Sequence, residues 1–262
     1  MGTQVRASAG LRPVLEYWLL RSRTSWRTAL GVMVLAPVLY LGALGVGLGS
    51  LVDDNNPAAL DGAQYLAFLA PGLLATAAMQ TGFDDAAWPV QGALRWWKSY
   101  PAQQATSLRT RDLLGGHLAY IALRLTVAAV LFVAIGAVFG AFDSAGVLAA
   151  IPVAVLCGMA HVTPAAAYAV GVRSEISIAA VYRFLVLPVS LFSGAFYPVS
   201  QLPTGLEQAA YLSPLWHGVD LCRDLCLGTA SWAGTGHLAY LLLWLLGGYA
   251  VAVRRYRNRL EP

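Results

Sequence analysis

Long apolar runs alternate with short polar segments along most of the chain. A helix needs about 20 apolar residues to cross the hydrocarbon core of a bilayer. Six runs come close to that length: Ala29–Leu51, Tyr65–Phe83, Leu118–Phe142, Val147–Gly171, Ile178–Tyr197 and Leu238–Val253. The last run is short and is expected to begin nearer Trp232. Because the runs are continuously apolar and do not alternate, they favour helices over a β-barrel. The pattern predicts an all-α polytopic membrane protein with six transmembrane helices.

The composition agrees with a membrane environment. Of the 262 residues, 58% are hydrophobic and 11% are charged. A soluble globular protein has roughly 45–50% apolar and about 25% charged residues. This chain therefore has too few charges for a soluble surface, and too much apolar side chain for a disordered protein. Both classes are excluded.

Basic residues gather in alternate segments between the spans. The opposite segments carry Asp53, Asp54, Asp61 and Asp143, with Arg223 as their one basic residue. Because Lys and Arg are retained in the cytoplasm, both termini are predicted to be cytoplasmic. Fourteen of the 17 Lys and Arg residues lie on that side: Arg6, Arg12, Arg21, Arg23, Arg27, Arg95, Lys98, Arg109, Arg111, Arg173, Arg254, Arg255, Arg257 and Arg259.

This charge distribution gives the net charge of +4 a topological meaning. Basic residues beside spans interact with the membrane surface, so they do not indicate nucleic-acid binding. Arginine outnumbers lysine 16 to 1, which is typical of a GC-rich bacterial genome. We therefore predict a multi-pass protein of a bacterial plasma membrane, with membrane lipid as one partner and nucleic acid excluded.

The N-terminal segment, residues 1–28, contains an amphipathic stretch at Arg12–Arg27. At helical spacing, Arg12, Arg23 and Arg27 share one face with Glu16, and Trp18 and Trp26 lie on the other, with Arg21 as an exception. Such a helix is expected to lie flat in the membrane interface. The alternative is a basic flank that only sets the topology. At the other end of the chain, residues 254–262 are predicted to form a basic tail that follows the transmembrane domain of residues 29–253.

The cytoplasmic loop at residues 84–112 is too long for a simple turn. Asp84 and Asp85 begin it and are interpreted as a solvated helix cap. A helix ended by Pro101 would then present an aromatic, basic ridge to a groove of a partner protein. The alternative is an aromatic belt at the interface. The ridge would contain Trp88, Arg95, Trp96, Trp97, Lys98 and Tyr100.

The outer segment at residues 197–236 is too apolar for a plain loop. Prolines at positions 198, 203 and 214 divide it, and Gly205–Leu212 and Leu215–Leu227 are predicted to form two short helices. One interpretation is a re-entrant helical hairpin that dips back into the membrane against protein. The other is a helical pair lying flat on the outer surface.

The sequence contains no recognisable catalytic or metal site. An ATP site of the P-loop type needs a glycine-rich loop before Lys, whereas the single lysine, Lys98, follows Trp97. The four histidines are scattered, and Cys222 and Cys226 fit no standard zinc spacing. We therefore expect a chain that is not an enzyme and binds no metal or cofactor itself.

Three polar residues inside the spans are candidates for function. His161 is expected to be a hydrogen-bonded interior residue or to take part in substrate or proton movement. Arg124 and Arg183 lie near the cytoplasmic ends of their spans. Each could extend to the membrane surface, or could mark the entrance for an anionic or amphipathic substrate.

Two motifs resemble a known family. Tyr65-Leu66-Ala67-Phe68-Leu69-Ala70-Pro71-Gly72-Leu73 in the second span is the first, and Leu191-Phe192-Ser193-Gly194-Ala195-Phe196-Tyr197-Pro198-Val199 at the end of the fifth span is the second. Together they resemble the permeases of ABC transporters, in the group that exports lipo-oligosaccharides and drugs. Leu212-Ser213-Pro214-Leu215-Trp216-His217, Arg223 and Gly228 fit the same pattern.

The resemblance implies a permease that pairs with a second one, identical or homologous, and with two ATPase subunits that hold ATP and Mg²⁺. It makes Arg12–Arg27 a connecting helix and Trp88–Pro101 a coupling helix on the ATPase. The expected pathway or entrance residues are Arg124, His161, Arg183, Phe192 and Phe196, and those of an extracellular hairpin that closes the pathway are Pro198, Pro203, Pro214 and His217.

One position departs from the family pattern. Members often have Gly-Glu before the third span, where this chain has Gly116-His117. Two rival functions also stay open at the level of sequence. They are a polytopic membrane enzyme acting on lipids, and a membrane scaffold or sensor protein.

Overall fold

The computed structural model describes residues 10–55, 64–106, 108–142, 144–232 and 234–261. Arg6, Asp61 and Asp143, which entered the charge distribution, lie outside the described residues. Within the described residues, the chain folds into helices and contains six that are long and apolar enough to cross a membrane. The prediction of an all-α protein with six spans is confirmed.

Four of the spans are single long helices. They are α4 (Tyr65–Arg95), α6 (Thr110–Val138), α7 (Val147–Gly171) and α12 (Gly234–Leu260). The first span consists of α2 (Trp26–Tyr40), the π-helical η1 (Leu41–Val46) and α3 (Gly47–Asn55). The fifth consists of α8 (Glu175–Val181), the π-helical η3 (Tyr182–Val186) and α9 (Leu187–Phe192).

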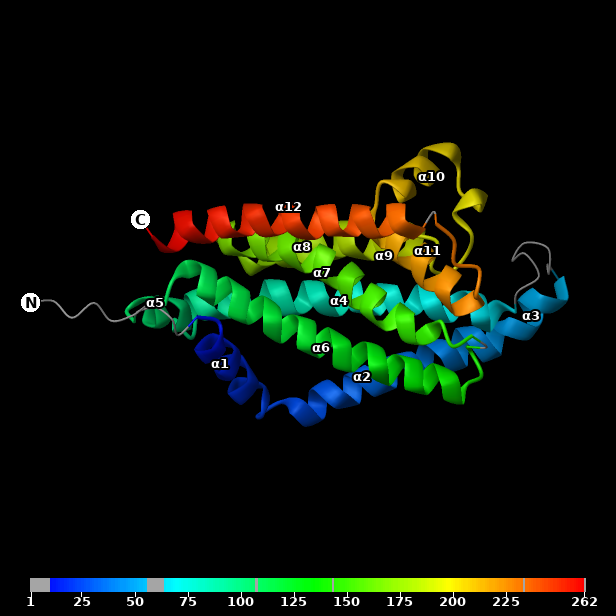
Figure 1. Cartoon of the computed structure of the whole chain (residues 1–262), viewed down its shortest axis with the longest axis horizontal. Helices are drawn as coiled ribbons and strands as arrows, with labels where there is room; N and C mark the ends of the chain where they lie inside the picture. The colour runs from blue at the N-terminus through cyan, green and yellow to red at the C-terminus, as the bar shows by residue number, and fades with distance from the viewer. Residues whose placement is uncertain (1–9, 56–63, 107, 143, 233, 262) are drawn as a thin grey trace, which may run out of the picture.

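Shorter helices occupy the two ends of the bundle (Figure 1). Helix α1 (Arg12–Ser22), helix α5 (Ser99–Gln104) and the C-terminal end of α12 lie at one end. The 3₁₀ turn η4 (Val199–Gln201) and helices α10 (Thr204–Tyr211) and α11 (Pro214–Leu227) belong to the other. The two short helices predicted in the outer segment are therefore confirmed, within a residue or two. Their depth relative to a membrane stays a prediction.

Several predicted boundaries are wrong because helices continue past their apolar cores. Helix α4 runs on to Arg95, through the segment assigned to a loop. Helix α6 begins at Thr110, where the Arg109 backbone N–H donates to the Asp112 carboxylate at 3.0 Å. Helix α12 continues to Leu260, so the basic C-terminal segment is helical rather than a tail. The hydrophobic pattern detects only the part of each helix that is apolar.

Two further boundaries are shorter than predicted. The amphipathic stretch Arg12–Arg27 is not one helix, because α1 ends at Ser22 and Trp26 already begins the first span. The Thr24 hydroxyl donates to the Arg21 carbonyl at 2.9 Å in the intervening turn, a local bond that competes with helical pairing. The fifth span ends at Phe192, ahead of the predicted Tyr197.

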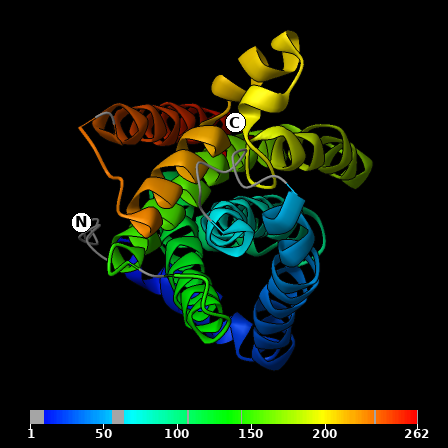
Figure 2. The ribbon, with the colours of Figure 1, turned by 90° about the vertical axis from the view of Figure 1, so that its right-hand side faces the viewer.

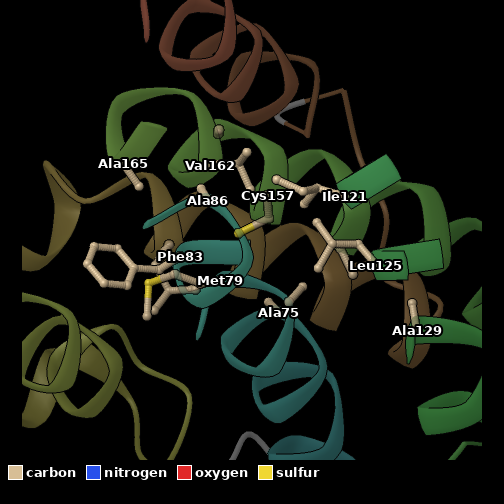
Figure 3. Packing of buried hydrophobic residues seen from close by; sticks show 14 of the residues in the cluster. Ala75, Met79, Phe83, Ala86, Ile121, Leu125, Ala129, Cys157, Val162 and Ala165 are labelled. Carbon is tan, nitrogen blue, oxygen red and sulfur yellow. The ribbon is translucent and has the colours of Figure 1, made fainter. Parts of the chain in front are cut away.

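Helix α4 occupies the centre of the bundle. Viewed along the helices, the cyan α4 is surrounded by the first, third, fourth and fifth spans and by α11 (Figure 2). Helices α4 and α7 approach closely at Gly158. A Cβ at this position would lie only 2.9 Å from the Ala78 carbonyl oxygen. Small residues give the same close approach in many membrane helix pairs. Met79, Leu125 and Cys157 fill the space around this contact (Figure 3).

Candidate translocation pathway

A cavity of about 490 Å³ lies between the first, second, third and fifth spans. Its wall is formed largely by apolar side chains, among them Val32, Leu73 and Phe132. The fifth span contributes Tyr182, and Phe196 follows from the segment after that span. A cavity of this size can hold a drug-sized molecule or one part of a larger amphipathic one.

Charged residues of α4 and α6 lie together in the cavity wall. The Arg124 guanidinium of α6 and the Asp85 carboxylate of α4 form an ion pair, with Nη1 and Oδ1 2.6 Å apart. Gln80, Thr81 and Asp84 line the cavity on the same helix as Asp85. The described charged groups on the wall are thus two carboxylates and one guanidinium, and Arg124 offers no unpaired positive charge to an anionic ligand.

This arrangement corrects one prediction and bears on another. Asp84 and Asp85 are not a solvated cap, because α4 continues beyond them and Asp85 is only 8% exposed. Arg124 lines the cavity and is held by Asp85 rather than extending freely to the membrane surface. Burial of either charge alone would be costly, and the pair offsets that cost.

The two recognised motifs meet at the end of the cavity nearer α10 and α11. Gly72 of α4 touches the segment after the fifth span so closely that a Cβ there would lie 2.7 Å from the Ala195 Cα. Gly194 adopts a left-handed backbone with φ of 81°, which glycine tolerates best. The Tyr65 hydroxyl donates to the Phe196 carbonyl at 3.3 Å. These contacts hold Phe196 against the cavity.

Arg223 of α11 binds the segment after the fifth span from the side of the hairpin. Its Nη2 donates to the Gly194 carbonyl at 2.7 Å, and its Nε donates to the Phe68 carbonyl at 3.3 Å. The guanidinium also lies 3.7 Å from the centre of the Phe68 ring, a favourable cation–π geometry. Burial lowers the pKa of Arg223 to about 10, so the side chain stays cationic at neutral pH. The sequence identified this residue only by resemblance.

The opposite end of the bundle carries the predicted coupling residues. Arg95, Trp96 and Lys98 are exposed around the turn between α4 and α5, and Lys98 has a φ of 48°. Trp97 lies under the Arg21 guanidinium, 3.3 Å from the ring centre, and connects this turn to α1. Trp88 is 36% exposed, two helical turns earlier in α4.

The predicted single helix over Trp88–Pro101 is therefore wrong. The chain turns after Arg95, and Pro101 lies in the first turn of the new helix α5 instead of ending a helix. A proline fits there because the first backbone N–H groups of a helix have no intrahelical partner. Tyr100 is fully buried and is not available to a partner surface.

Tyr100 instead joins His117 in a buried aromatic cluster that the sequence did not predict. The Tyr100 hydroxyl and the His117 Nδ1 are 3.2 Å apart. The Trp18 ring of α1 stacks on the His117 imidazole, with the ring centres 4.1 Å apart, and Tyr256 of α12 packs against Tyr100 at 6.0 Å. Burial raises the pKa of Tyr100 well above its usual value. The residue that departs from the family pattern thus connects four helices.

The sequence profile of the ABC-2 type transporter family matches residues 17–227, most of the chain. This protein belongs to the ABC-2 type transporter family. It is 28% identical to Nodulation protein J of Rhizobium leguminosarum bv. viciae over 264 residues, 99% of each chain. It is 30% identical to Nodulation protein J of Sinorhizobium fredii over 248 residues, 92% of this chain and 91% of that one. No solved structure matches the chain.

Family membership makes this chain a membrane transport permease and confirms the recognition made from the two motifs. It favours transport over the membrane-enzyme and scaffold hypotheses. The cavity and the turn after α4 are accordingly the parts of the ABC-2 permease to examine for transport and coupling.

The remaining predicted pathway residues of the permease lie outside the cavity wall. Arg183 and Phe192 are exposed on the fifth span, and neither lines the cavity. His161 donates from Nδ1 to the Cys157 carbonyl of its own helix at 2.8 Å. This contact favours the first interpretation of His161, as a hydrogen-bonded interior residue. Of the five predicted residues, the structure brings Arg124 and Phe196 to the cavity.

The hairpin of the permease is joined to the last span by histidines. His217 of α11 and His237 of α12 place their Nδ1 atoms 3.2 Å apart, and His217 Nε2 is 3.1 Å from the Tyr211 carbonyl. His237 Nε2 lies 3.7 Å from the Asp220 carboxylate. Burial, and then the charge of His237, lowers the pKa of His217. The three predicted hairpin prolines precede η4 and α10 or begin α11.

Proposed function

We propose that this ABC-2 permease exports an amphipathic or lipid-like molecule, such as a lipo-oligosaccharide or a hydrophobic drug, across a bacterial plasma membrane. The observation that carries the proposal is the cavity between the loosely packed first and fifth spans and the central α4. Its wall is mostly apolar, and its charged residues are the Asp85–Arg124 pair and the neighbouring Asp84. An amphipathic molecule matches both parts of such a wall.

The charges on the cavity wall indicate which kind of polar head group the substrate would have. Arg124 is paired with Asp85, and Asp84 adds a second carboxylate. Hydroxyl, amide or ammonium groups can donate hydrogen bonds to such a surface, whereas an anionic head would be repelled. This argues for a sugar-bearing or cationic head, and against the anionic entrance considered from the sequence.

The energy would come from two ATPase subunits that bind ATP and Mg²⁺ on the cytoplasmic side. Arg95, Trp96 and Lys98 form an exposed basic and aromatic turn suited to a groove on such a partner. Movement of this turn would reach α6 through Tyr100 and His117, and α1 through Trp97 and Trp18. ATP-driven closure shifts the permease between inward and outward access only if the ATPases contact the two states differently.

A second permease, identical or homologous, would complete the pathway. The first and fifth spans leave large apolar faces uncovered, including Leu35 at 58% and Phe184 at 82% exposure. A sister permease seated on both spans would enclose the cavity between two chains. The concentration of Arg at the end that carries α1 and the C-terminal end of α12 supports a cytoplasmic location for that end.

Transport by the reconstituted complex tests the proposal. The permease would be co-purified with a candidate ATPase and placed in liposomes, and ATP-dependent movement of a fluorescent lipo-oligosaccharide would be followed. Ala128→Phe narrows the cavity and is expected to abolish transport, whereas Ala122→Phe, on the same helix but outside the cavity wall, is the matched control. Normal transport by Ala128→Phe would contradict the assignment of the pathway.

Association with the ATPase tests the coupling surface separately. Trp96→Ala with Lys98→Ala is expected to weaken ATPase binding without lowering the amount of permease in the membrane. Trp88→Ala, on α4 away from the turn, is the control. If all three substitutions leave binding unchanged, the ATPase docks elsewhere, and the pathway assignment stands or falls with the transport assay alone.

A further inference from the structure

A second hollow lies on the outside of the bundle, between α7 and α12. This groove has a volume of about 630 Å³ and shares no residue with the translocation cavity. It is formed almost entirely by apolar and aromatic side chains, with one charged residue, Arg255, near the C-terminal end of α12. Its residues are Pro164, Ala167, Tyr168, Tyr240, Leu243, Trp244, Gly247, Gly248, Val251 and Arg255.

Small residues draw the two helices together and leave the groove open. A Cβ at Gly248 would lie 2.8 Å from the Pro164 Cδ, so glycine is needed for this close contact. The Thr163 hydroxyl of α7 donates to the Leu245 carbonyl of α12 at 3.1 Å and fixes the pair. By contrast, a Cβ at Gly247 would meet nothing within 4 Å. Gly247 therefore provides depth to the groove rather than helix contact.

The charge at the end of the groove is unsatisfied by protein. In the described part of the chain Arg255 forms no ion pair, whereas Arg257, half a turn further on, pairs with Glu261 at 3.6 Å. Arg255 is exposed, and the groove wall contains no carboxylate. An anionic group positioned at this end would find a free guanidinium with several N–H donors.

The part of the groove between Arg255 and Trp244 is about as long as one leaflet of a bilayer. Arg255 and Trp244 are eleven residues apart on α12, which corresponds to about 16 Å along the helix axis. Half of the hydrocarbon core is about 15 Å thick. With Arg255 at the level of the headgroups, Gly247 and Ala167 lie at the depth of the acyl chains.

We propose that this groove binds one anionic phospholipid, with its phosphate on Arg255 and an acyl chain along Gly247 and Ala167. The alternative occupant is a membrane helix of a second copy. That packing would bring together the basic ends of α12, which carry Arg254, Arg255, Arg257 and Arg259. Like charges repel one another and attract anionic headgroups, so the charge favours lipid.

Lipid binding to the purified full-length chain tests this site. Native mass spectrometry would measure binding of phosphatidylglycerol and, as the zwitterionic reference, phosphatidylcholine. Arg255→Gln is expected to weaken phosphatidylglycerol binding at least about tenfold relative to Arg254→Gln, because a charge-assisted contact is lost. Arg254 is the matched control, since it carries the same charge beside Arg255 but does not line the groove.

Filling the groove tests the acyl-chain part of the site. Gly247→Leu adds a side chain where there is open space, and Val251→Phe does so at an exposed position nearer Arg255. Both are expected to release the lipid while Arg255 is intact. Equal loss in the two arginine variants, or full lipid binding by both groove-filling variants, would overturn the proposal. The proposal would also be overturned if Gly247→Leu converted a dimer to a monomer in the mass spectra and still bound the lipid, because a second copy would then occupy the groove.

Discussion

The second and fourth spans differ sharply from the first and fifth. In the most apolar stretch of each span, 72% of the residues of α4 and 44% of those of α7 are buried, against 17% in the first and the fifth, a value that α12 shares. The first pair forms the centre of the fold, with glycines at the contact. The second pair covers the cavity and leaves large apolar surfaces free. A transporter needs both kinds of helix, because a fixed core allows the walls of a pathway to move.

The loosely packed spans also share a local irregularity. Each contains a π-helical segment, η1 in the first span and η3 in the fifth, and Tyr182 of η3 lines the cavity. π-Helical turns are rare and are often found at functional sites. Regions with few buried contacts open at lower free energy than the core does. The two spans are therefore the parts of this permease best suited to alternating access.

The largest expected effect comes from the ion pair where the two regions meet. Asp85→Asn leaves Arg124 without its counter-charge beside the cavity, and removal of one partner of a buried pair costs roughly 3–5 kcal/mol. Because the Arg124 side chain is 28% exposed, we expect a loss of stability near the lower limit. Thermal melting of the purified protein in detergent would measure it.

The double variant Asp85→Asn, Arg124→Gln separates charge from packing. It removes both charges and is expected to recover most of the melting temperature that Asp85→Asn loses, while transport stays impaired. A double variant no more stable than Asp85→Asn would show that the ion pair is not what joins α4 to α6 here.

Gly72→Val tests the contact between the core and the segment after the fifth span. The new side chain would collide with Ala195, and overpacking of this kind costs about 1–3 kcal/mol. Gly31→Val in the first span is the control, because nothing lies within 4 Å of a Cβ there. Melting curves should separate the two variants clearly. Equal melting temperatures would mean that the core and the loosely packed spans tolerate added volume alike.

The hydrophobic pattern predicted the number of spans because a bilayer crossing sets a minimum length. It did not predict where helices end, since the polar turn at Arg109 and the basic end of α12 continue helices outside the apolar core. The ion pair was missed for the same reason, because its two charges can be placed only once these helix ends are known. Asp85 lies ten residues before the end of α4 and Arg124 fourteen after the start of α6, so opposite charges stand at similar depths.

Other parts of the candidate site could not be predicted from sequence. Trp18, Tyr100, His117 and Tyr256 belong to four different helices, two of them near the opposite ends of the chain. No local periodicity indicates that their side chains meet, because the contact depends on how α1, α5, α6 and α12 pack. The same holds for the groove at Gly247, which exists only where α12 lies on α7.

His117→Ala is expected to have a smaller effect on stability and a larger one on coupling. The stacking with Trp18 and the contact with Tyr100 are together worth about 1–2 kcal/mol. ATPase activity of the complex should then continue with less transport per ATP hydrolysed. His117→Phe keeps the stacking and serves as the control. Unchanged coupling in both variants would confine His117 to a packing role.

The smallest effect expected is a dependence of stability on pH at the outer end. Burial lowers the pKa of His217 in the folded protein. Below about pH 6.5 the unfolded chain therefore binds a proton at this residue more readily than the folded protein does. Stability should therefore be fully present above that pH and fall as the pH is lowered. The titratable group that faces His217 is His237, which in turn lies beside Asp220. The other neighbours of His217 are the rings of Trp216 and Tyr240 and the backbone carbonyl of Tyr211.

Melting curves between pH 5 and pH 8 would show this dependence, by less than the stability changes above. His217→Gln removes the proton-binding group and is expected to flatten the curve, whereas Cys226→Ala, a buried change on the same helix, should lower stability equally at all pH values. A pH dependence that survives in His217→Gln would show that His217 is not its source. In either case we expect acidification to destabilise the contact between α11 and α12 first, while α4 and α7 keep their packing.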